Sequence, residues 1–183
     1  EAYGYRIDTP DRHIVISGLG QVGGRLARAL AADGARLSVA DVNPDKKALA
    51  DELGADWVAV GDAHRLDADL FVPCGLGGVL TPEVIAELGA RGVVGAANNQ
   101  LARHDGAEAL AARGILWAPD FVVNAGVVID LSMASEPNAD AAAIDARVAA
   151  IGDTVATIFR EAEQNGTTTL EAAEALSAAR LAA

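Results

Sequence analysis

The sequence predicts an α/β protein in which a doubly wound parallel sheet of about six strands is flanked by helices. Short apolar runs alternate with longer amphipathic stretches from residue 13 onward, as in parallel strands joined by crossover helices. The 183 residues include 19 glycines, and 51% of the chain is apolar although only 4% is aromatic. Small and aliphatic residues in this proportion favour helices that pack closely on a buried sheet.

The expected elements follow one another in the order that such a sheet requires. The patterns predict strands over 13–17, 37–40, 57–60, 70–72, 93–94 and 115–117. They predict helices between these strands over 22–32, 44–53, 81–88 and 105–112. Gly34 and Gly54 stand just past the first two helices, while Asn43 and Pro44 suit the N-cap and first position of the second.

The last quarter of the chain has only helical periodicity. Two helices are predicted there, over 141–164 and 169–181. We expect them to fold back over the sheet or its edge rather than to form a second domain. Residues 1–183 then make one domain, with a sheet-bearing core over 13–135 and C-terminal helices over 140–183.

Composition and charge exclude several classes of protein. The net charge of -12 disfavours binding to nucleic acids or anionic membranes, because both would be repelled. Cys74 is the only cysteine, so no internal disulfide is possible and a reducing, cytoplasmic compartment is expected. No apolar run approaches the roughly 20 residues of a membrane helix, and the first ten residues do not resemble a signal peptide.

A glycine-rich loop between the first strand and the first helix predicts a dinucleotide-binding Rossmann fold. It comprises Gly18, Gly20, Gln21, Val22 and Gly23 in a G-x-G-x-x-G pattern. The first glycine allows a tight turn, the second lets the backbone approach a pyrophosphate, and the third permits close packing of helix and strand. The N–H groups that begin the helix are then directed at the phosphates.

An acidic residue at the end of the second strand favours NAD over NADP. Asp41 follows the glycine loop by about 20 residues, where a carboxylate would accept hydrogen bonds from the adenosine ribose. It would also repel the additional phosphate of NADP, and neither Val42 nor Asn43 supplies a compensating arginine. The alternative is that Asp41 is only a solvated carboxylate at a strand end.

Three further segments follow the fourth, fifth and sixth predicted strands, where ligands bind in an open parallel sheet. They are Pro73-Cys74-Gly75-Leu76-Gly77-Gly78-Val79-Leu80, Gly95-Ala96-Ala97-Asn98-Asn99-Gln100-Leu101 and Ala118-Pro119-Asp120-Phe121-Val122-Val123-Asn124-Ala125-Gly126. The small residues after Cys74 allow close approach to a planar ring or a ribose. Asn98 and Asn124 each offer a donor and an acceptor, although either could instead cap or brace a turn.

In order and content these segments resemble the cofactor-binding domain of the glutamate/leucine/phenylalanine/valine dehydrogenases, and the phenylalanine and leucine enzymes most of all. The resemblance extends from His13 to the last helix. It implies that Asn98 binds the nicotinamide ribose and that Asn124 lies near the nicotinamide and the substrate. It further implies a cofactor-binding surface that includes Cys74, Gly75, Leu76 and Ala97.

One residue departs from the family pattern. The family usually has a second glycine where this chain has Val127. A β-branched residue there is expected to crowd the backbone or to narrow the space beside the nicotinamide.

The resemblance implies oxidative deamination of an L-amino acid to a keto acid and ammonia, with catalytic lysines in a separate N-terminal domain. Lys46 and Lys47 are the only lysines here, and both fall early in a predicted helix. The three histidines and single cysteine have no metal-ligand spacing. We therefore predict a chain that binds NAD without catalytic residues of its own, with a separate catalytic domain or chain as partner.

Other interpretations remain open at this stage. Because the sequence opens on Glu1 rather than Met, a truncated or cleaved cofactor domain of a two-domain enzyme is the first hypothesis. The second is a stand-alone NAD-binding or sensing module without enzymatic activity. A third is a dehydrogenase of another small acid with catalytic groups supplied in trans. An apolar surface that would otherwise face the catalytic domain across the substrate cleft would favour a homo-oligomer if it were exposed.

Overall fold

The computed structural model describes residues 12–133 and 140–182, and its centre is one parallel sheet. The strands are β1 (His13–Ser17), β2 (Arg36–Ala40), β3 (Asp56–Trp57), β4 (Ala68–Pro73), β5 (Ala90–Val93) and β6 (Leu116–Trp117). Their spatial order is β3-β2-β1-β4-β5-β6, and every neighbouring pair is parallel. The order reverses between β1 and β4, which defines the switch point of a Rossmann fold. The predicted fold class is therefore confirmed.

Helices join and flank the strands. The α-helices are α1 (Gln21–Ala32), α2 (Lys47–Leu53), α3 (Pro82–Glu87), α4 (Gly106–Ala112), α5 (Asp120–Val123), α6 (Gly126–Met133), α7 (Ala141–Asn165) and α8 (Thr169–Leu181). Two 3₁₀ turns, η2 (Pro44–Lys46) and η3 (Ala63–Arg65), follow β2 and β3.

Alternating side chains of the central strands build a core on each face of the sheet. Ile14 and Ile16 of β1 pack in one cluster with residues of α1 and α2, such as Ala27 and Ala50. Val15, between them, belongs to the other cluster, to which α3, α4 and the start of α8 contribute. Both faces are thus covered, as a sheet of nearly continuous apolar strands requires.

Helix boundaries follow the capping residues that the sequence offers. Asn43 caps η2 by accepting the N–H of Asp45 at 3.0 Å, and Gly54 ends α2 with a φ of 65°. Thr168 and Glu171 form a complete capping box at the start of α8. These local signals explain why the predicted starts and ends lie within a few residues of those observed.

Three predicted elements need correction, one of them the strand expected over 93–94, which is Ala90–Val93. The strand expected over 57–60 is Asp56–Trp57 only, and the single helix expected over 44–53 begins with the 3₁₀ turn η2. In the segment after β6, where no helix was predicted, the chain forms α5 and α6.

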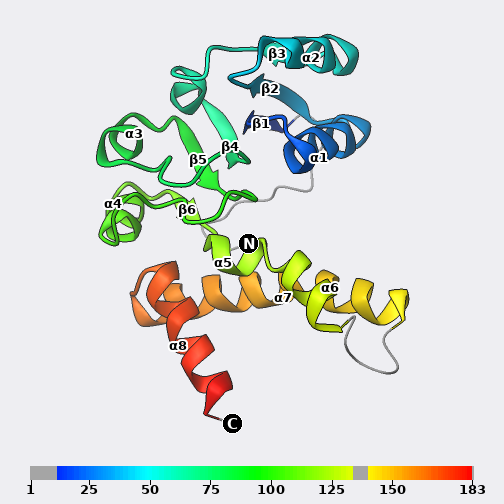
Figure 1. The fold of residues 1–183 in the computed structure, drawn as a ribbon. Helices are drawn as coiled ribbons and strands as arrows, with labels where there is room; N and C mark the ends of the chain where they lie inside the picture. The colour runs from blue at the N-terminus through cyan, green and yellow to red at the C-terminus, as the bar shows by residue number, and fades with distance from the viewer. Residues whose placement is uncertain (1–11, 134–139, 183) are drawn as a thin grey trace.

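The helices α5–α8 gather below the sheet in Figure 1, where α7 contacts α5, α6 and α8. A cluster of Ile158, Ala162, Ala172 and Ala173 joins α7 to α8, and Val122 of α5 packs against it. These helices also reach the sheet, because the Thr169 hydroxyl donates to the Trp117 carbonyl at 2.7 Å. Among the described residues, no helix combines the length and apolarity that a membrane span requires.

Candidate functional site

The turn from β1 into α1 brings backbone groups closer together than any side chain would allow. Gly18 has a φ of 103°, which favours glycine, and a Cβ there would lie 2.8 Å from the Gly75 nitrogen. A Cβ on Gly23 would lie 1.9 Å from the Gly18 carbonyl oxygen. The first and third glycines of the loop therefore hold α1 tightly against β1 and the loop after β4.

The N-terminus of α1 is left open for an anion. Gly20 is its N-cap, no side chain caps the helix, and no acidic residue lies in its first turn. A Cβ on Gly20 would meet nothing within 4 Å, and Val22 in the first turn is 57% exposed. Helix N–H groups without internal partners, together with the helix dipole, favour a phosphate at this position. Gln21, also exposed, lies in the same turn.

Asp41 lies at the end of β2 and is tied to the glycine loop. Its Oδ2 accepts the N–H of Leu19 at 2.6 Å, and its Oδ1 accepts the N–H of Asn43 at 2.8 Å. Each carboxylate oxygen can accept more than one hydrogen bond. Asp41 therefore fixes the loop while keeping acceptor capacity for a ligand hydroxyl.

A cavity of about 350 Å³ opens beside these residues at the strand ends. It is lined by Ser17, Gly18, Ala40, Asp41, Val42, Val60, Pro73, Gly75, Leu76, Gly77 and Val79. Val42 and Leu76 are 87% and 90% exposed, so two large apolar side chains stand at its rim with little packing of their own. Such a cleft, mostly apolar and with a carboxylate at one side, suits the flat base and ribose of a nucleotide.

Cys74 is part of the frame around this cavity. Its N–H donates to the Ser17 carbonyl at 2.8 Å, and its Cβ would approach a Cβ on Gly23 to 3.0 Å. Burial raises the pKa of the Cys74 thiol, although a hydrogen bond with the backbone of Ala96 opposes that shift. The thiol is therefore a neutral packing group at the switch point.

The structure brings the two predicted asparagines together. The Asn124 side-chain amide donates to the Asn98 side-chain carbonyl at 2.5 Å, which joins the end of α5 to the loop after β5. Ala97 is buried, and its N–H donates to the Pro73 carbonyl at 3.0 Å. Ala97 therefore supports the loop through its backbone, whereas Asn98 is exposed and Asn124 is only partly buried.

Gln100 holds the asparagine loop in place, a role that its local sequence does not reveal. Its side chain is completely buried, and its amide donates to the carbonyls of Gly95 at 2.8 Å and Ala97 at 3.1 Å. Its carbonyl accepts the Trp117 indole N–H at 3.1 Å, so all of its hydrogen bonds are internal. The loop that bears Asn98 is thus fixed to β6.

We predict that Gln100→Leu lowers the free energy of unfolding by about 2–4 kcal/mol. The apolar side chain has a similar size but leaves buried carbonyl and indole groups without partners, and each such group costs about 1–3 kcal/mol. Urea unfolding followed by tryptophan fluorescence measures the change. Gln164→Leu on the exposed side of α7 is the matched control, and equal losses in both variants would contradict the assigned role.

Several residues differ from expectation or were missed. Val60, Gly77 and Val79 line the cavity, although the sequence marked Val60 only as the end of a strand. Val127 does not crowd the protein backbone, because it lies on α6 with its side chain 68% exposed. The His13 ring is engaged by the Ser38 hydroxyl and the Asp67 carbonyl, each at 2.8 Å. No group of three or more potential metal ligands occurs within the described ranges.

Comparison with known proteins extends this picture. The model of the glutamate/leucine/phenylalanine/valine dehydrogenase family matches residues 42–183. A valine dehydrogenase of Streptomyces albus is 43% identical over 178 residues, which are 94% of this chain and 48% of that protein. A phenylalanine dehydrogenase of Caldalkalibacillus thermarum is 37% identical over 178 residues, 93% of this chain and 48% of that protein. The chain spans about half the length of these curated relatives.

A solved structure agrees in fold and sequence. The L-tryptophan dehydrogenase of Nostoc punctiforme superposes with a TM-score of 0.90 at 37% identity, over 93% of this chain and 51% of that one. The family match begins after the glycine loop and Asp41 and includes the later site segments and the C-terminal helices, whereas the structural match covers 93% of the chain. This chain belongs to the glutamate/leucine/phenylalanine/valine dehydrogenase family.

Proposed function

We propose that this chain binds NAD and forms the cofactor half of an NAD-dependent amino-acid dehydrogenase. The observation that carries the proposal is the junction of β1 and α1. There Gly18 and Gly23 permit close packing of α1 on β1. The uncapped N-terminus of α1 lies beside the cavity at the strand ends, which Asp41 lines. A pyrophosphate at the helix N-terminus would place the adenosine in that cavity.

The preference for NAD rests on Asp41 and its neighbour. The carboxylate is held by the N–H groups of Leu19 and Asn43, so it cannot turn away from a phosphate on the ribose. Val42 is 87% exposed and carries no charge that would attract such a phosphate. A ribose with two free hydroxyls fits this end of the cavity better than one bearing a phosphate.

The other end of the site favours a substrate with an apolar side chain. Asn124 lies next to Asn98 and just before α6, whose Val127, Val128 and Leu131 are 68%, 68% and 66% exposed. Three exposed apolar side chains on one short helix suit an apolar ligand better than a charged one. Relatives named for phenylalanine, valine and tryptophan agree with this choice.

The chain supplies binding and orientation rather than proton transfer. When bound, NAD accepts a hydride from the substrate α-carbon, while Asn98 and Asn124 hold the nicotinamide end. The only lysines, Lys46 in η2 and Lys47 in α2, follow β2 in the chain. In the sheet, β2 is three strands away from β5, after which Asn98 lies. Lys47 is paired with Asp51 at 2.7 Å. We therefore propose that the groups that activate water come from the remainder of a longer protein or from another chain.

Calorimetric titration of the chain with NAD and NADP tests the proposal. We expect saturable binding of NAD, binding of NADP weaker by about tenfold or more, and no turnover of L-valine or L-phenylalanine. Equal affinity for both nucleotides would contradict the role of Asp41. Absence of binding would contradict the cofactor assignment, and turnover would show that the chain already holds its proton-transfer groups.

A further inference from the structure

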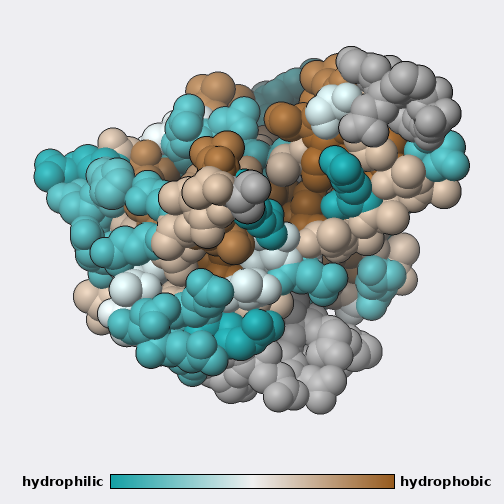
Figure 2. Space-filling model, turned by 90° about the horizontal axis from the view of Figure 1, so that it is seen from below, coloured by the Kyte–Doolittle hydropathy of each residue, from teal (hydrophilic) through white to brown (hydrophobic). Residues whose placement is uncertain are grey.

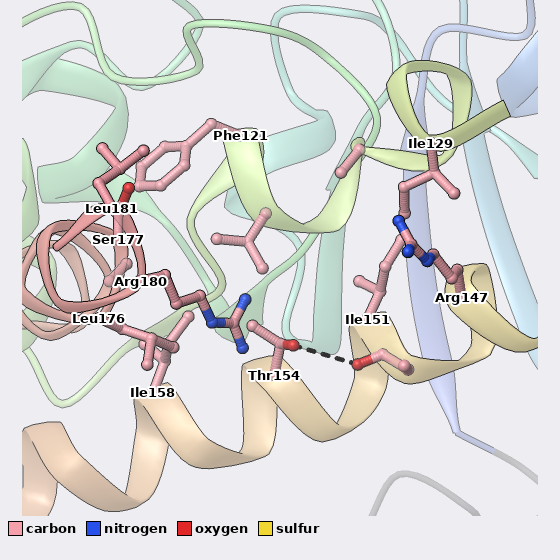
Figure 3. A pocket seen from close by; sticks show the side chains of 14 residues that line it. Phe121, Ile129, Arg147, Ile151, Thr154, Ile158, Leu176, Ser177, Arg180 and Leu181 are labelled. Carbon is pink, nitrogen blue, oxygen red and sulfur yellow. Dashed lines mark hydrogen bonds between the residues drawn. The ribbon is translucent and has the colours of Figure 1, made fainter. Parts of the chain in front are cut away.

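A second and larger cavity lies among the C-terminal helices, apart from the strand-end site. It has a volume of about 610 Å³ and is walled by α5, α6, α7 and α8. Its lining shares no residue with the strand-end cavity. Figure 3 shows the side chains of all four helices turned toward one space. The volume lies within the range of pockets that bind small molecules.

The floor and walls of this helix pocket are apolar. Ile158 and Ala173, which are 1% and 3% exposed, belong to the cluster that joins α7 to α8 and form its base. Phe121 and Leu181 stand at the rim, 48% and 88% exposed. Viewed from below, hydrophobic side chains line recesses of this face between hydrophilic ones (Figure 2). The pocket therefore offers a recessed hydrophobic surface with an open mouth.

Two arginines add positive charge to the lining of this apolar pocket. Arg147 of α7 and Arg180 of α8 line it, together with the hydroxyls of Thr154 and Ser177. In Figure 3 the Arg180 guanidinium extends across the pocket toward Thr154, and that of Arg147 lies beside Ile129. No carboxylate within 12–133 or 140–182 lies within 4.0 Å of either guanidinium. Nor does the lining contain any acidic residue, although acidic residues outnumber basic ones 26 to 14 in the chain.

This arrangement selects a ligand by charge as well as by shape. A guanidinium pairs with a carboxylate through two parallel hydrogen bonds, and the apolar walls would bury the rest of the molecule. Arg180 lies in the last turn of α8, whose C-terminal carbonyls oppose negative charge, so a ligand with one negative charge suits the pocket better than a nucleoside polyphosphate. A free ammonium group would find no carboxylate partner in the lining, so an amino acid would bind less well than the corresponding acid.

We propose that the helix pocket binds an organic monocarboxylate with an apolar body, such as an aromatic or branched aliphatic acid without an amino group. The carboxylate would pair with Arg180, which extends across the pocket, while Arg147 adds positive charge on the other side, and the hydrocarbon would contact Phe121, Ile151 and Leu176. This site is separate from the proposed cofactor site, so both ligands bind at the same time.

Calorimetric titration with 3-phenylpropanoate tests this proposal, with 3-phenylpropanamide and L-phenylalanine as matched probes. We expect the acid to bind with a dissociation constant below about 10 mM, and both matched probes to bind at least about tenfold more weakly. The double variant Arg147→Gln/Arg180→Gln should lose at least about tenfold in affinity for the acid. Arg160→Gln, on α7 but outside the lining, should keep it.

Circular dichroism and titration with NAD accompany each variant. Retained helicity and unchanged NAD affinity would assign a loss to the pocket, and acid binding that persists at saturating NAD would place it outside the cofactor site. The proposal would be overturned if the acid and the amide bound equally well, or if the double variant bound the acid as tightly as the parent. Either result would favour the apolar surface of another protein as the occupant of the pocket. No acid binding up to about 10 mM, or displacement of the acid by NAD, would also overturn it.

Discussion

Gly20→Ala is expected to weaken NAD binding by about tenfold to 100-fold while leaving the fold intact, whereas Gly23→Ala should damage both. A Cβ at Gly20 meets nothing within 4 Å of the protein, so its methyl group would occupy only the space proposed for the pyrophosphate. A Cβ at Gly23 would lie 1.9 Å from the Gly18 carbonyl oxygen, and α1 must shift to accept it. Overpacking of this kind costs about 1–3 kcal/mol or more.

Two measurements separate these effects. Urea unfolding gives the free energy of unfolding, which should fall for Gly23→Ala and stay near that of the parent for Gly20→Ala. Calorimetry gives the NAD affinity, which should fall for both. Gly152→Ala on α7, where a Cβ also meets nothing within 4 Å, is the control that should keep the NAD affinity and raise the free energy of unfolding by about 0.5–1 kcal/mol, as alanine inside a helix does. Unchanged affinity in Gly20→Ala would argue against a phosphate at the N-terminus of α1.

The glycine pattern could be predicted because its physical basis is local. Gly18, Gly20 and Gly23 lie within one turn, between a strand and a helix that periodicity already defines. The same holds for the caps at Asn43 and Gly54, which depend on backbone groups a few residues away. Elements with such signals were placed to within a few residues.

Residues that contact distant parts of the chain could not be predicted in this way. Asp41 accepts the N–H of Leu19, 22 positions earlier, and Gln100 accepts the indole N–H of Trp117, 17 positions later. Neither partner can be identified from a periodic pattern, because only the folded sheet brings the loops after β1 and β2 together. Their role in supporting the site therefore became visible in the structure alone.

Exposed apolar residues were a second obstacle to prediction from the pattern. Val60 ends an apolar run that predicts a strand, yet β3 stops at Trp57 and Val60 lines the strand-end cavity at 43% exposure. Val127 and Val128 lie in the first turn of α6, but with side chains 68% exposed they contribute little to a core. Sequence periodicity reports burial in a core, so apolar residues kept for a ligand or a partner appear as an irregular segment.

Asp41→Ser combined with Val42→Arg is expected to change the ratio of NAD to NADP affinity by about 100-fold in favour of NADP. The serine removes the charge that repels the ribose phosphate while its hydroxyl can still accept a backbone N–H. Val42 is 87% exposed, so an arginine there can extend along the cavity rim without displacing packed atoms. Each change is worth about tenfold, the magnitude of a charge-assisted hydrogen bond gained or a like-charge contact removed.

Two further variants, Val42→Arg alone and Asp41→Ala, show why both changes are needed. In Val42→Arg alone the new guanidinium lies beside Asp41 and is neutralised by it, so the NADP affinity should rise less than in the double variant. In Asp41→Ala the Leu19 N–H loses its acceptor, so both nucleotides should bind more weakly and the loop should become less stable. Calorimetry of the parent and the three variants with both nucleotides gives four ratios of NAD affinity to NADP affinity. If the double variant kept the parent preference, the ribose would not lie against Asp41, and the adenosine half of the site would have to be placed elsewhere along the strand ends.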